Sequence, residues 1–586
     1  MTRHVIKITG ASGSGLLSTG EILMKALKRQ GFYMNADREY PSLIKGGHAN
    51  FQVNFSTEKV HALSQKVDLF LAVDRVGLKE YIHTAPKGSI FVHGDERYKL
   101  IVPNVEKKAE ELSVRLVYLP ARQIAYSFGG NELMTNMVLL GLAWRVLGLP
   151  LNKLQEEVEK RFASKPKILE IDLKCLKAGY DANGIPDLPK LDISHPKKTP
   201  KTMLINGTEA LCLGAIHAGV RAYYAYPMSP SSGILTYIAK KAKETGMLVK
   251  QGEDEITVAE MTLGSMFMGT RALSATSGGG YDLMTETVSL SGITETPFVI
   301  VNCQRPGPGT GLPTWTCQGD LDLALYSSHG EFPRAVLACS DPESSYELIQ
   351  HALNIAEKYQ IIVVVLTEKT ILESRMTTEF FELKKIPIER GIVTDPNALK
   401  NLVSKNRYEF TESGVSLRWL PGSGPAHYYA NGDEHHEDGT LAEDAEPAKK
   451  MMEKRMRKLK TVEETLPEPE IYGSPKGADV SFVGWGSTKN VMLDAIQEAK
   501  LLKLSINYLH YDYVWPLKTK VAQKFFEENK NVCLVEGNYL GQFGTLFEAK
   551  SGLKFQEKFL KYDGRAFYLE EVLEFSKKIQ NLKFKI

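Results

Sequence analysis

Two short segments near the middle of the chain carry the residue types best suited to chemistry. Residues 226–232 read Tyr-Pro-Met-Ser-Pro-Ser-Ser, and residues 251–256 read Gln-Gly-Glu-Asp-Glu-Ile. The first segment is a Pro- and Ser-rich turn, and the second opens a helix-like run. Carboxylates in a first helical turn are favoured by the helix dipole alone. A carboxylate held there against a bound heterocycle could also polarise that ring, which would define the reaction class.

Arg305 and Ser229 are further candidates for ligand binding. Arg305 follows an apolar strand and precedes a Gly- and Pro-rich loop. An arginine at a strand end can bind a carboxylate through two hydrogen bonds, although the same position also suits an ordinary surface or interface arginine. Ser229 lies between Pro227 and Pro230, which stiffen the loop. The same loop could instead serve only as a helix cap.

Length, composition and charge favour an ordinary globular protein. The 586 residues are 43% hydrophobic and 24% charged, enough for roughly three or four domains. The net charge of +2 favours neither nucleic acid nor a membrane surface as a partner. The first residues run straight into a strand without a signal-like segment, and the apolar runs are too short to span a bilayer, so we expect a cytoplasmic protein. The six cysteines form no C-x-x-C pair, so we expect this chain alone to hold no iron–sulfur cluster or zinc.

Alternating strand-like and helix-like patterns predict an α/β protein with several domains. The predicted parts are a first α/β domain with a parallel sheet (1–190), a linker (191–202), a second α/β domain (203–385), a connecting segment (386–475) and a third α/β domain (476–586). The main predicted strands cover residues 5–9, 68–73, 89–92, 222–226, 272–276, 297–302, 361–366, 480–483 and 532–535.

Polar segments elsewhere admit both a functional and a structural interpretation. The glycine-rich residues 10–20 lack a complete G-x-G-x-x-G pattern, so a tight strand-to-helix turn is favoured over a ligand loop. Residues 432–439 hold two histidines and several carboxylates, but a solvated loop is favoured over a metal site. The basic residues 449–460 lack interleaved aromatics, which favours a solvated helix face over an RNA site.

A combination of motifs resembles the pyrimidine-binding domain of 2-oxoacid:ferredoxin oxidoreductases, which are thiamine diphosphate enzymes. The motifs are residues 226–232, Glu-Asp-Glu-Ile at 253–256, Ala-Thr-Ser-Gly-Gly-Gly at 275–280 and Gln-Arg-Pro-Gly-Pro-Gly-Thr-Gly-Leu-Pro-Thr at 304–314. The last motif is long and unusual, so the combination is specific. The first 190 residues or so resemble the family's gamma unit, and the rest resembles its alpha unit. The chain is thus similar to a fused gamma–alpha subunit whose third domain is of the transketolase C-terminal type.

The resemblance implies that Glu255 is the glutamate that activates the cofactor, because Glu255 precedes Gly264 by the family's spacing. Glu253 is the fallback. Hydrogen-bonded to the aminopyrimidine ring, the carboxylate would favour the imino tautomer, whose nitrogen removes the C2 proton of the thiazolium. Burial would raise the pKa of the carboxyl group and help it share a proton with the ring. Pro227 and Met228 are expected beside the cofactor.

The resemblance also assigns ligand-binding roles. Arg305 matches the family's substrate-binding arginine. Ser229 stands where the family usually has a threonine, and this change leaves the chain length of the 2-oxo acid open. The segment Lys45-Gly46-Gly47 resembles the family's Arg-Gly-Gly segment, and its implied neighbourhood is that of coenzyme A.

A partner chain is implied as well. The sequence has no Gly-Asp-Gly followed by Asn, the usual thiamine motif for Mg²⁺ and the diphosphate, and no cysteine cluster. The resemblance therefore implies a beta subunit that supplies the diphosphate end, Mg²⁺ and a [4Fe–4S] cluster, in an (alpha–beta)₂ assembly that reduces ferredoxin. The expected reaction is the oxidative decarboxylation of a 2-oxo acid with coenzyme A to acyl-CoA and CO₂.

The substrate and the reaction keep alternatives. We expect 2-oxoglutarate first, with pyruvate and branched-chain 2-oxo acids as alternatives, and the physiological direction stays open. A non-oxidative thiamine-dependent decarboxylase or transferase subunit is a second interpretation of the same motifs. A non-catalytic scaffold subunit is a third.

Overall fold

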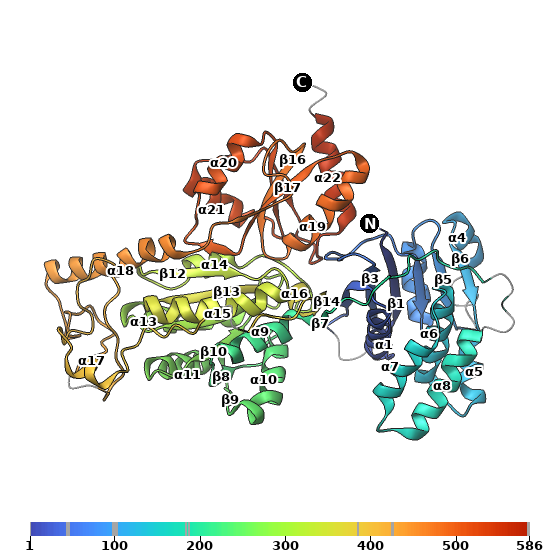
Figure 1. The fold of residues 1–586 in the computed structure, drawn as a ribbon, viewed down its shortest axis with the longest axis horizontal. Helices are drawn as coiled ribbons and strands as arrows, with labels where there is room; N and C mark the ends of the chain where they lie inside the picture. Colours follow the sequence, from blue (N-terminus) through green and yellow to red (C-terminus); the bar gives the residue numbers. More distant parts are fainter. Residues whose placement is uncertain are drawn as a thin grey trace. The chain divides into compact units, whose positions relative to one another are not determined.

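The computed structural model describes residues 2–42, 47–96, 103–181, 185, 188–383, 386–423 and 427–582. Contacts between residues divide the chain into two compact units. Figure 1 labels the helices and strands of the chain. Unit 1 comprises Met1–Ile205, Glu373–Phe380 and Phe567–Leu573, and unit 2 comprises Asn206–Leu372, Phe381–Ala566 and Glu574–Ile586. The mixture of helices and sheets in both units agrees with the α/β class predicted from the sequence.

Unit 1 is built on a sheet with the strand order β6-β5-β4-β1-β3-β2-β14-β7. The strands are β1 His4–Ala11, β2 Tyr33–Glu39, β3 His48–Ser56, β4 Leu69–Ala72, β5 Ile90–His93, β6 Arg115–Tyr118, β7 Met203–Asn206 and β14 Arg375–Thr378. Strands β1, β4, β5 and β6 are parallel neighbours, but β3 pairs antiparallel with both β1 and β2, and β14 pairs antiparallel with β2. The prediction of a parallel sheet in the first domain is therefore wrong for this half of the sheet. Consecutive strands can reverse directly without a crossover helix.

Close helix packing accompanies this sheet. The helices are α1 Leu16–Arg29, α2 Arg75–Tyr81, α4 Val105–Glu111, α5 Ala121–Ser127, α6 Thr135–Val146, α7 Asn152–Phe162 and α8 Pro166–Asp181, with short 3₁₀ turns at Ile82–Thr84 and Glu132–Met134. Helix α6 is buried along nearly its whole length. It approaches α8 closely because Gly141 and Gly179 have no side chains. A Cβ atom at either position would collide with the backbone of the other helix.

Unit 2 contains a sheet with the order β18-β12-β13-β11-β10-β8-β9. Its strands are β8 Ala222–Ala225, β9 Leu248–Gln251, β10 Ala272–Thr276, β11 Phe298–Gln304, β12 Arg334–Ala338, β13 Ile362–Glu368 and β18 Tyr513–Trp515. Strands β8 to β13 run parallel and β10 to β13 are fully buried, as expected for strands covered by helices on both faces. Strand β18 comes from the third predicted domain and pairs antiparallel with β12.

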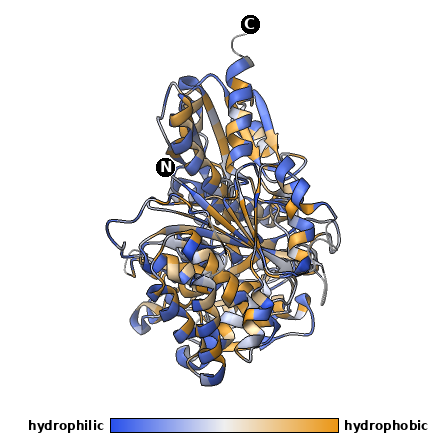
Figure 2. Cartoon of the chain, turned by 90° about the vertical axis from the view of Figure 1, so that its right-hand side faces the viewer, coloured by the Kyte–Doolittle hydropathy of each residue, from blue (hydrophilic) through white to orange (hydrophobic). Residues whose placement is uncertain are grey.

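Helices alternate with the strands of this sheet, and Figure 2 shows that helices of the chain carry both hydrophobic (orange) and hydrophilic (blue) residues. The alternating helices are α9 Gly207–His217, α10 Ser232–Thr245, α11 Glu255–Phe267, α12 Gly278–Leu283, α13 Thr285–Ile293, α14 Leu321–Tyr326, α15 Pro342–Tyr359 and α16 Lys369–Glu373. Side-chain caps define where several of them begin. Asn206 and Glu209 form a capping box at α9, and Asp341 and Ser344 form one at α15.

The rest of unit 2 holds a second sheet with the order β15-β17-β16-β19-β20. Its strands are β15 Glu470–Tyr472, β16 Val480–Trp485, β17 Ile506–Tyr511, β19 Val532–Glu536 and β20 Glu557–Leu560. Its helices are α19 Thr488–Ala499, a 3₁₀ turn at Lys500–Leu502, α20 Lys520–Glu528 and α21 Gln542–Ser551. The last helix, α22 Leu569–Leu582, begins in residues assigned to unit 1 and ends in residues assigned to unit 2. Both strands that we predicted in this region, residues 480–483 and 532–535, are present as β16 and β19.

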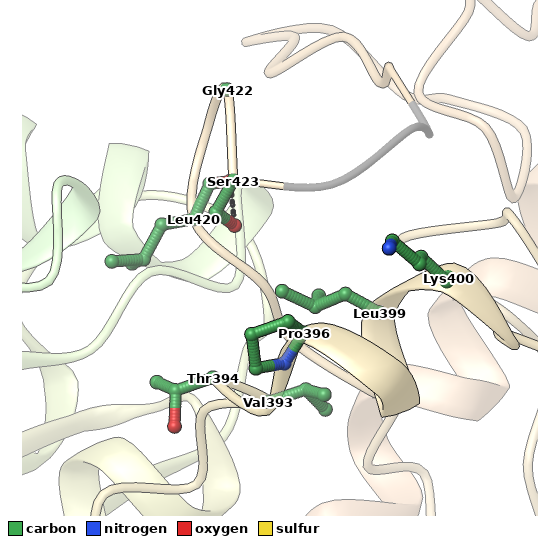
Figure 3. Close-up of a pocket in the computed structure, with 8 residues that line it drawn as sticks. All are labelled: Val393, Thr394, Pro396, Leu399, Lys400, Leu420, Gly422 and Ser423. Carbon is green, nitrogen blue, oxygen red and sulfur yellow. Dashed lines mark hydrogen bonds between the residues drawn. The ribbon is translucent and has the colours of Figure 1, made fainter.

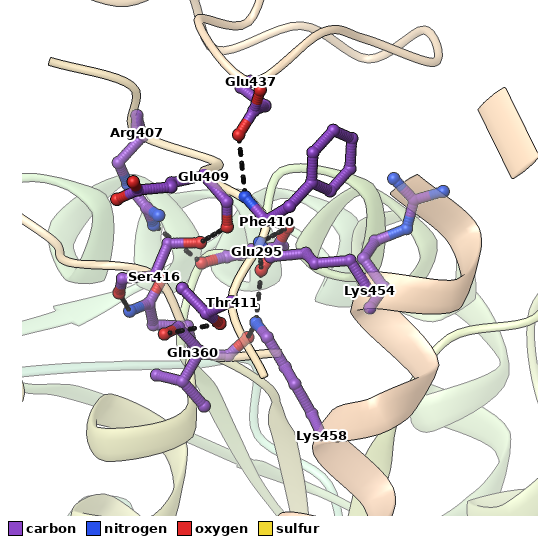
Figure 4. A network of polar contacts seen from close by, with 12 residues as sticks. Glu295, Gln360, Arg407, Glu409, Phe410, Thr411, Ser416, Glu437, Lys454 and Lys458 are labelled. Atoms are coloured by element: carbon purple, nitrogen blue, oxygen red, sulfur yellow. Dashed lines mark hydrogen bonds and ion pairs between the residues drawn. The ribbon is translucent and has the colours of Figure 1, made fainter. Parts of the chain in front are cut away.

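The segment between the two sheets contains α17 Pro396–Lys400 and α18 Ala445–Thr465. Helix α18 holds the predicted basic run, but the prediction of a solvated face is wrong for part of it. Lys454 and Lys458 are fully buried, and both bind the buried carboxylate of Glu295, with 2.6 Å between Lys454 Nζ and Glu295 Oε1 (Figure 4). A buried charge requires a partner, and Glu295 is the partner here.

The loop at residues 432–439 differs from its prediction in the same way. Glu434 forms a bidentate ion pair with the buried Arg455 of α18, with 2.8 Å between Oε1 and Nη1. His435 is fully buried, and its ring nitrogens face the carbonyl oxygens of His436 and Ile293. The prediction of a solvated loop is therefore wrong for these two residues, which fasten the loop to the rest of unit 2.

Candidate active site

Glu255 is the first residue of α11, and its side chain is turned into the protein. The carboxylate of Asp254 caps the helix by accepting a hydrogen bond of 2.7 Å from the Thr257 backbone N–H. Glu255 is only 3% exposed, and its Oε1 atom is buried without a hydrogen-bond partner among the described residues. Burial raises the pKa of Glu255, and the charge of Asp254 adds to the rise. Glu253, the fallback, is exposed.

A glycine-rich turn between β10 and α12 packs closely against this carboxylate. A side chain at Gly280 would collide with Thr276 Oγ1, and its Cβ would lie 2.5 Å from Glu255 Oε1. Thr276 Oγ1 lies 4.0 Å from Met228 Sδ, which brings one of the predicted cofactor-binding residues to the same place. Gly279, by contrast, faces open space. The missing side chain at Gly280 thus lets Thr276 and the Glu255 carboxylate pack directly against this turn.

The structure brings Ser229 and Arg305 together. Arg305 follows the end of β11, and its Nη1 donates a hydrogen bond of 2.7 Å to the backbone carbonyl of Ser229. Burial lowers the pKa of Arg305, while the charge of Asp320 opposes that change. Ser229 and Pro227 are exposed, and Met228 is half-buried. The two residues predicted to bind substrate therefore form one polar corner, although they are 76 positions apart in the sequence.

Asn302, Asp320 and Ser277 form a polar wall that sequence reasoning missed. Asn302 Nδ2 donates to Asp320 Oδ2 at 3.2 Å, while Asn302 Oδ1 and Ser277 Oγ are buried without partners in the part of the chain that the structure describes. Burial raises the pKa of Asp320 to about 6. An asparagine at the end of an apolar strand and an aspartate behind a Gly- and Pro-rich loop were the available signals.

The loop over residues 305–320 is fastened at its end to the second sheet. The side chain of Gln318 donates to the Trp485 carbonyl at 2.8 Å and accepts from the Gly537 N–H at 2.7 Å. Thr316 donates a hydrogen bond to Glu368. Burial raises the pKa of both Glu368 and Glu536 to about 7. The loop that carries Arg305 is thus held by buried polar contacts.

In unit 1, Gly47 of the predicted coenzyme A segment contacts the glycine-rich turn at residues 10–20. Lys45 and Gly46 lie outside the described residues. Gly47 is exposed, and its carbonyl accepts a hydrogen bond of 3.1 Å from the Ser12 N–H. A cavity of about 420 Å³ opens beside this turn, lined among others by Ser18, Arg38 and Arg161. The turn therefore borders a space that can hold a ligand.

A second cavity, of about 480 Å³, lies in the connecting segment of unit 2 (Figure 3). Val393, Pro396, Leu399 and Leu420 make its lining largely apolar, and Lys400 adds one charge at the α17 end. None of the residues predicted to bind ligands contributes to its lining. The cavity therefore adds nothing to the grouping around Glu255.

The residues that the structure describes contain neither a cluster suited to a metal ion nor a helix suited to a membrane. Across the described ranges, no cluster of three or more His, Cys, Asp and Glu side chains is placed to hold a metal ion. Five of the six cysteines are buried, and Cys317 is half-buried. Within the part of the chain that the structure covers, no helix has both the length and the apolar character needed to cross a bilayer.

Comparisons with known proteins identify the family of this chain. A family model described as pyruvate flavodoxin/ferredoxin oxidoreductase, thiamine diP-binding, matches residues 213–455, and one described as pyruvate ferredoxin/flavodoxin oxidoreductase matches residues 5–182. A 2-oxoacid:ferredoxin oxidoreductase subunit alpha of Sulfolobus sp is 30% identical, covering 97% of this chain and 95% of that protein. A 2-oxoglutarate oxidoreductase subunit KorA of Mycobacterium tuberculosis is 26% identical, covering 97% and 90%.

A solved structure extends the likeness to the fold. The 2-oxoglutarate:ferredoxin oxidoreductase from Magnetococcus marinus, with 2-oxoglutarate, coenzyme A and succinyl-CoA bound, superposes with a TM-score of 0.90 at 28% identity. The match covers 99% of this chain and 100% of that one. Identity, coverage and fold together show that the chain belongs to the 2-oxoacid:ferredoxin oxidoreductase family, as an alpha subunit.

Proposed function

We propose that this chain forms the pyrimidine half of a thiamine diphosphate site, with Glu255 touching the cofactor ring. The observation that supports this most strongly is the buried Glu255 Oε1, which lacks a partner among the described residues and lies against the glycine-rich turn at Gly280. A buried polar atom without a partner is costly, so a ligand that hydrogen-bonds to it is favoured. The ring nitrogen of an aminopyrimidine fits that requirement. When bound, the cofactor supplies the carbon nucleophile for the 2-oxo acid.

The surroundings of Glu255 suit a group that holds a proton. Because burial raises its pKa, the carboxyl group keeps its proton at higher pH than an exposed glutamate would and can share it with the ring nitrogen. We assign Met228 and Pro227 to the cofactor contact as well. Met228 Sδ approaches Thr276 Oγ1, which packs against the same glycine-rich turn as Glu255.

Arg305 and Ser229 are our candidates for binding the 2-oxo acid. The guanidinium of Arg305 uses Nη1 for the Ser229 carbonyl and keeps further N–H donors for a carboxylate. The Ser229 side chain is exposed at the same corner. We propose 2-oxoglutarate first, because the Magnetococcus marinus enzyme carries 2-oxoglutarate and the Mycobacterium tuberculosis relative is named for it. Pyruvate and branched-chain 2-oxo acids are the alternatives.

Coenzyme A is proposed to bind in unit 1, around the segment Lys45-Gly46-Gly47. The cavity of about 420 Å³ beside the glycine-rich turn supports this, since Arg38 and Arg161 lie along its lining and can attract phosphate groups. Both arginines also pair with carboxylates, Glu373 and Glu21 respectively, so a phosphate would compete with these pairs.

The remaining parts of the reaction are assigned to a beta subunit. We propose that this partner holds the diphosphate end, Mg²⁺ and a [4Fe–4S] cluster, and that the assembly is a cytoplasmic (alpha–beta)₂ enzyme that passes electrons to ferredoxin. The products would be acyl-CoA, CO₂ and reduced ferredoxin. The lack of a Gly-Asp-Gly…Asn motif and of a cysteine cluster in this sequence supports the division of labour.

The decisive experiment uses the complex of this chain with its beta partner. We expect dye reduction that depends on a 2-oxo acid and coenzyme A, and we expect Glu255→Gln to remove nearly all of it. Glu253→Gln is the matched control, because Glu253 is exposed two residues away and should leave activity unchanged. Full activity of the Glu255→Gln complex would contradict the assignment and favour a scaffold subunit. Release of CO₂ without reduction of the dye would favour a non-oxidative thiamine enzyme.

A further inference from the structure

The loop that begins at Arg305 closes back on its own starting point at Asp320. Asn302 Nδ2 donates to the Asp320 carboxylate at 3.2 Å, and the Asp320 backbone N–H donates to Gln304 Oε1 at 3.0 Å. Asn302 and Gln304 are buried residues at the end of β11. Strand end and loop end are therefore joined at one place, immediately before Arg305 leaves the strand.

The Asp320 carboxylate also faces the glycine-rich turn between β10 and α12. A Cβ at Gly278 would lie 2.9 Å from Asp320 Oδ2, so the carboxylate packs directly on that backbone. The charged and titratable groups around it are Arg305 from the end of β11, Asp282 from α12 and Cys317 from the loop itself, and the neutral amide of Asn302 donates a hydrogen bond to it. Burial raises the pKa of Asp320 to about 6, so the group is charged at neutral pH and loses its charge in mild acid.

Arg305 makes few polar contacts with its surroundings. Its guanidinium donates a hydrogen bond to the Ser229 carbonyl, and within the described residues no carboxylate lies close enough to form an ion pair with it. Asp320 attracts the guanidinium from a greater distance. A charge at that distance can orient the guanidinium without occupying the N–H donors that a ligand carboxylate needs.

We propose that Asp320 is a positioning residue, whose charge keeps Arg305 turned toward the 2-oxo acid while Asn302 and Gln304 hold Asp320 in place. This inference rests on the proposed function, in which Arg305 binds the carboxylate of the substrate. The unpartnered buried atoms Asn302 Oδ1 and Ser277 Oγ beside Asp320 support a ligand at this wall, because such atoms are costly unless a bound group satisfies them.

The test separates the charge of Asp320 from its hydrogen bond. Asp320→Asn keeps an acceptor for Asn302 but removes the charge, and Asp320→Ala removes both. Asp322→Asn is the control, since Asp322 lies on the same helix α14 and has no such tie to Arg305. In the alpha–beta complex we expect Asp320→Asn to raise KM for the 2-oxo acid roughly three- to tenfold at neutral pH, with kcat and melting temperature nearly unchanged.

The pH profile is the readout that a merely structural role would not move. We expect KM of the unmodified complex to rise as pH falls through about 6, toward the value of Asp320→Asn, whose own KM stays flat. Equal KM values for the unmodified complex and Asp320→Asn at every pH, or the same change in Asp322→Asn, would overturn the inference while the proposed function stands. If Asp320→Asn does not fold, a flat KM profile of the unmodified complex is enough to overturn it. Absence of any 2-oxo acid-dependent reduction by the unmodified complex would overturn both.

Discussion

Gly279 and Gly280 are neighbours in α12, but only Gly280 packs against Glu255. A methyl group at Gly280 would meet Thr276 Oγ1 and Glu255 Oε1, whereas one at Gly279 meets nothing within 4 Å. This difference separates a residue that shapes the site from one that shapes only the turn.

Gly280→Ala should therefore weaken cofactor binding. Inserting a methyl group into a packed place costs about 1–3 kcal/mol, and here the cost falls on the proposed cofactor contact, so we expect a loss of roughly tenfold or more in affinity for thiamine diphosphate. The measurement is activity of the alpha–beta complex against cofactor concentration. Gly279→Ala is the control and should match the unmodified complex. Equal cofactor affinity for both variants would contradict the proposal that the cofactor binds beside Gly280.

At the residue scale, the sequence predicted part of the site. The motif around Glu255 and the strand end before Arg305 could be recognised from local patterns. Asn302 and Asp320 could not, because their hydrogen bond joins positions 18 residues apart across a loop whose path the sequence does not give. The unpartnered atoms of Glu255, Asn302 and Ser277 are also properties of packing, which becomes visible only in three dimensions.

Among the elements, α18 depends most on one distant residue. Glu295, at the end of α13, accepts ion pairs from Lys454 and Lys458 of α18, and Arg407 donates to its backbone carbonyl at 3.2 Å. The ammonium groups hold the pKa of Glu295 well below its usual range. Burial lowers the pKa of Lys458 to about 7, and the nearby charge of Lys454 adds to the decrease. The Glu295 carboxylate therefore neutralises the buried ammonium groups of Lys454 and Lys458, which water cannot easily reach.

Glu295→Gln should destabilise unit 2 strongly. Removing one partner leaves buried ammonium groups without their counter-charge, a change that costs about 3–5 kcal/mol. The measurement is the denaturant midpoint or the melting temperature of the purified chain. Glu286→Gln changes an exposed carboxylate on α13, the helix that precedes Glu295, and should leave both unchanged. A melting temperature equal to that of the unmodified chain would show that the cluster contributes little.

The elements themselves were more predictable than their surroundings. The helical period of residues 449–460 is correct, but the exposure of the helix was misjudged because its partner Glu295 lies 159 positions before Lys454. A run of lysines and arginines in sequence carries no sign of a distant buried carboxylate. Strand β18 shows the same limit, since it follows β17 in sequence but pairs with β12 of the other sheet.

For the whole molecule, alternating strands and helices were enough to predict the α/β class, because that pattern reflects local periodicity. The mixed sheet of unit 1 was not predicted, since strand direction depends on which strands become neighbours. Strand β14, for example, pairs with β2 more than 300 residues earlier in the chain. The division of the cofactor site between two chains was inferred from motifs that this sequence lacks, and it leads to a test on the intact protein.

Removal of metal should affect the complex but not the isolated chain. We assign Mg²⁺ to the beta subunit, and the described residues of this chain contain no group of His, Cys, Asp and Glu placed to hold a metal. A chelator should therefore abolish 2-oxo acid-dependent dye reduction by the complex, and added Mg²⁺ should restore it. The melting temperature of the isolated chain should be the same with and without chelator, because binding of a metal to the folded state would raise it. A lower melting temperature of the isolated chain in chelator would place a metal in this chain and contradict the division of the site.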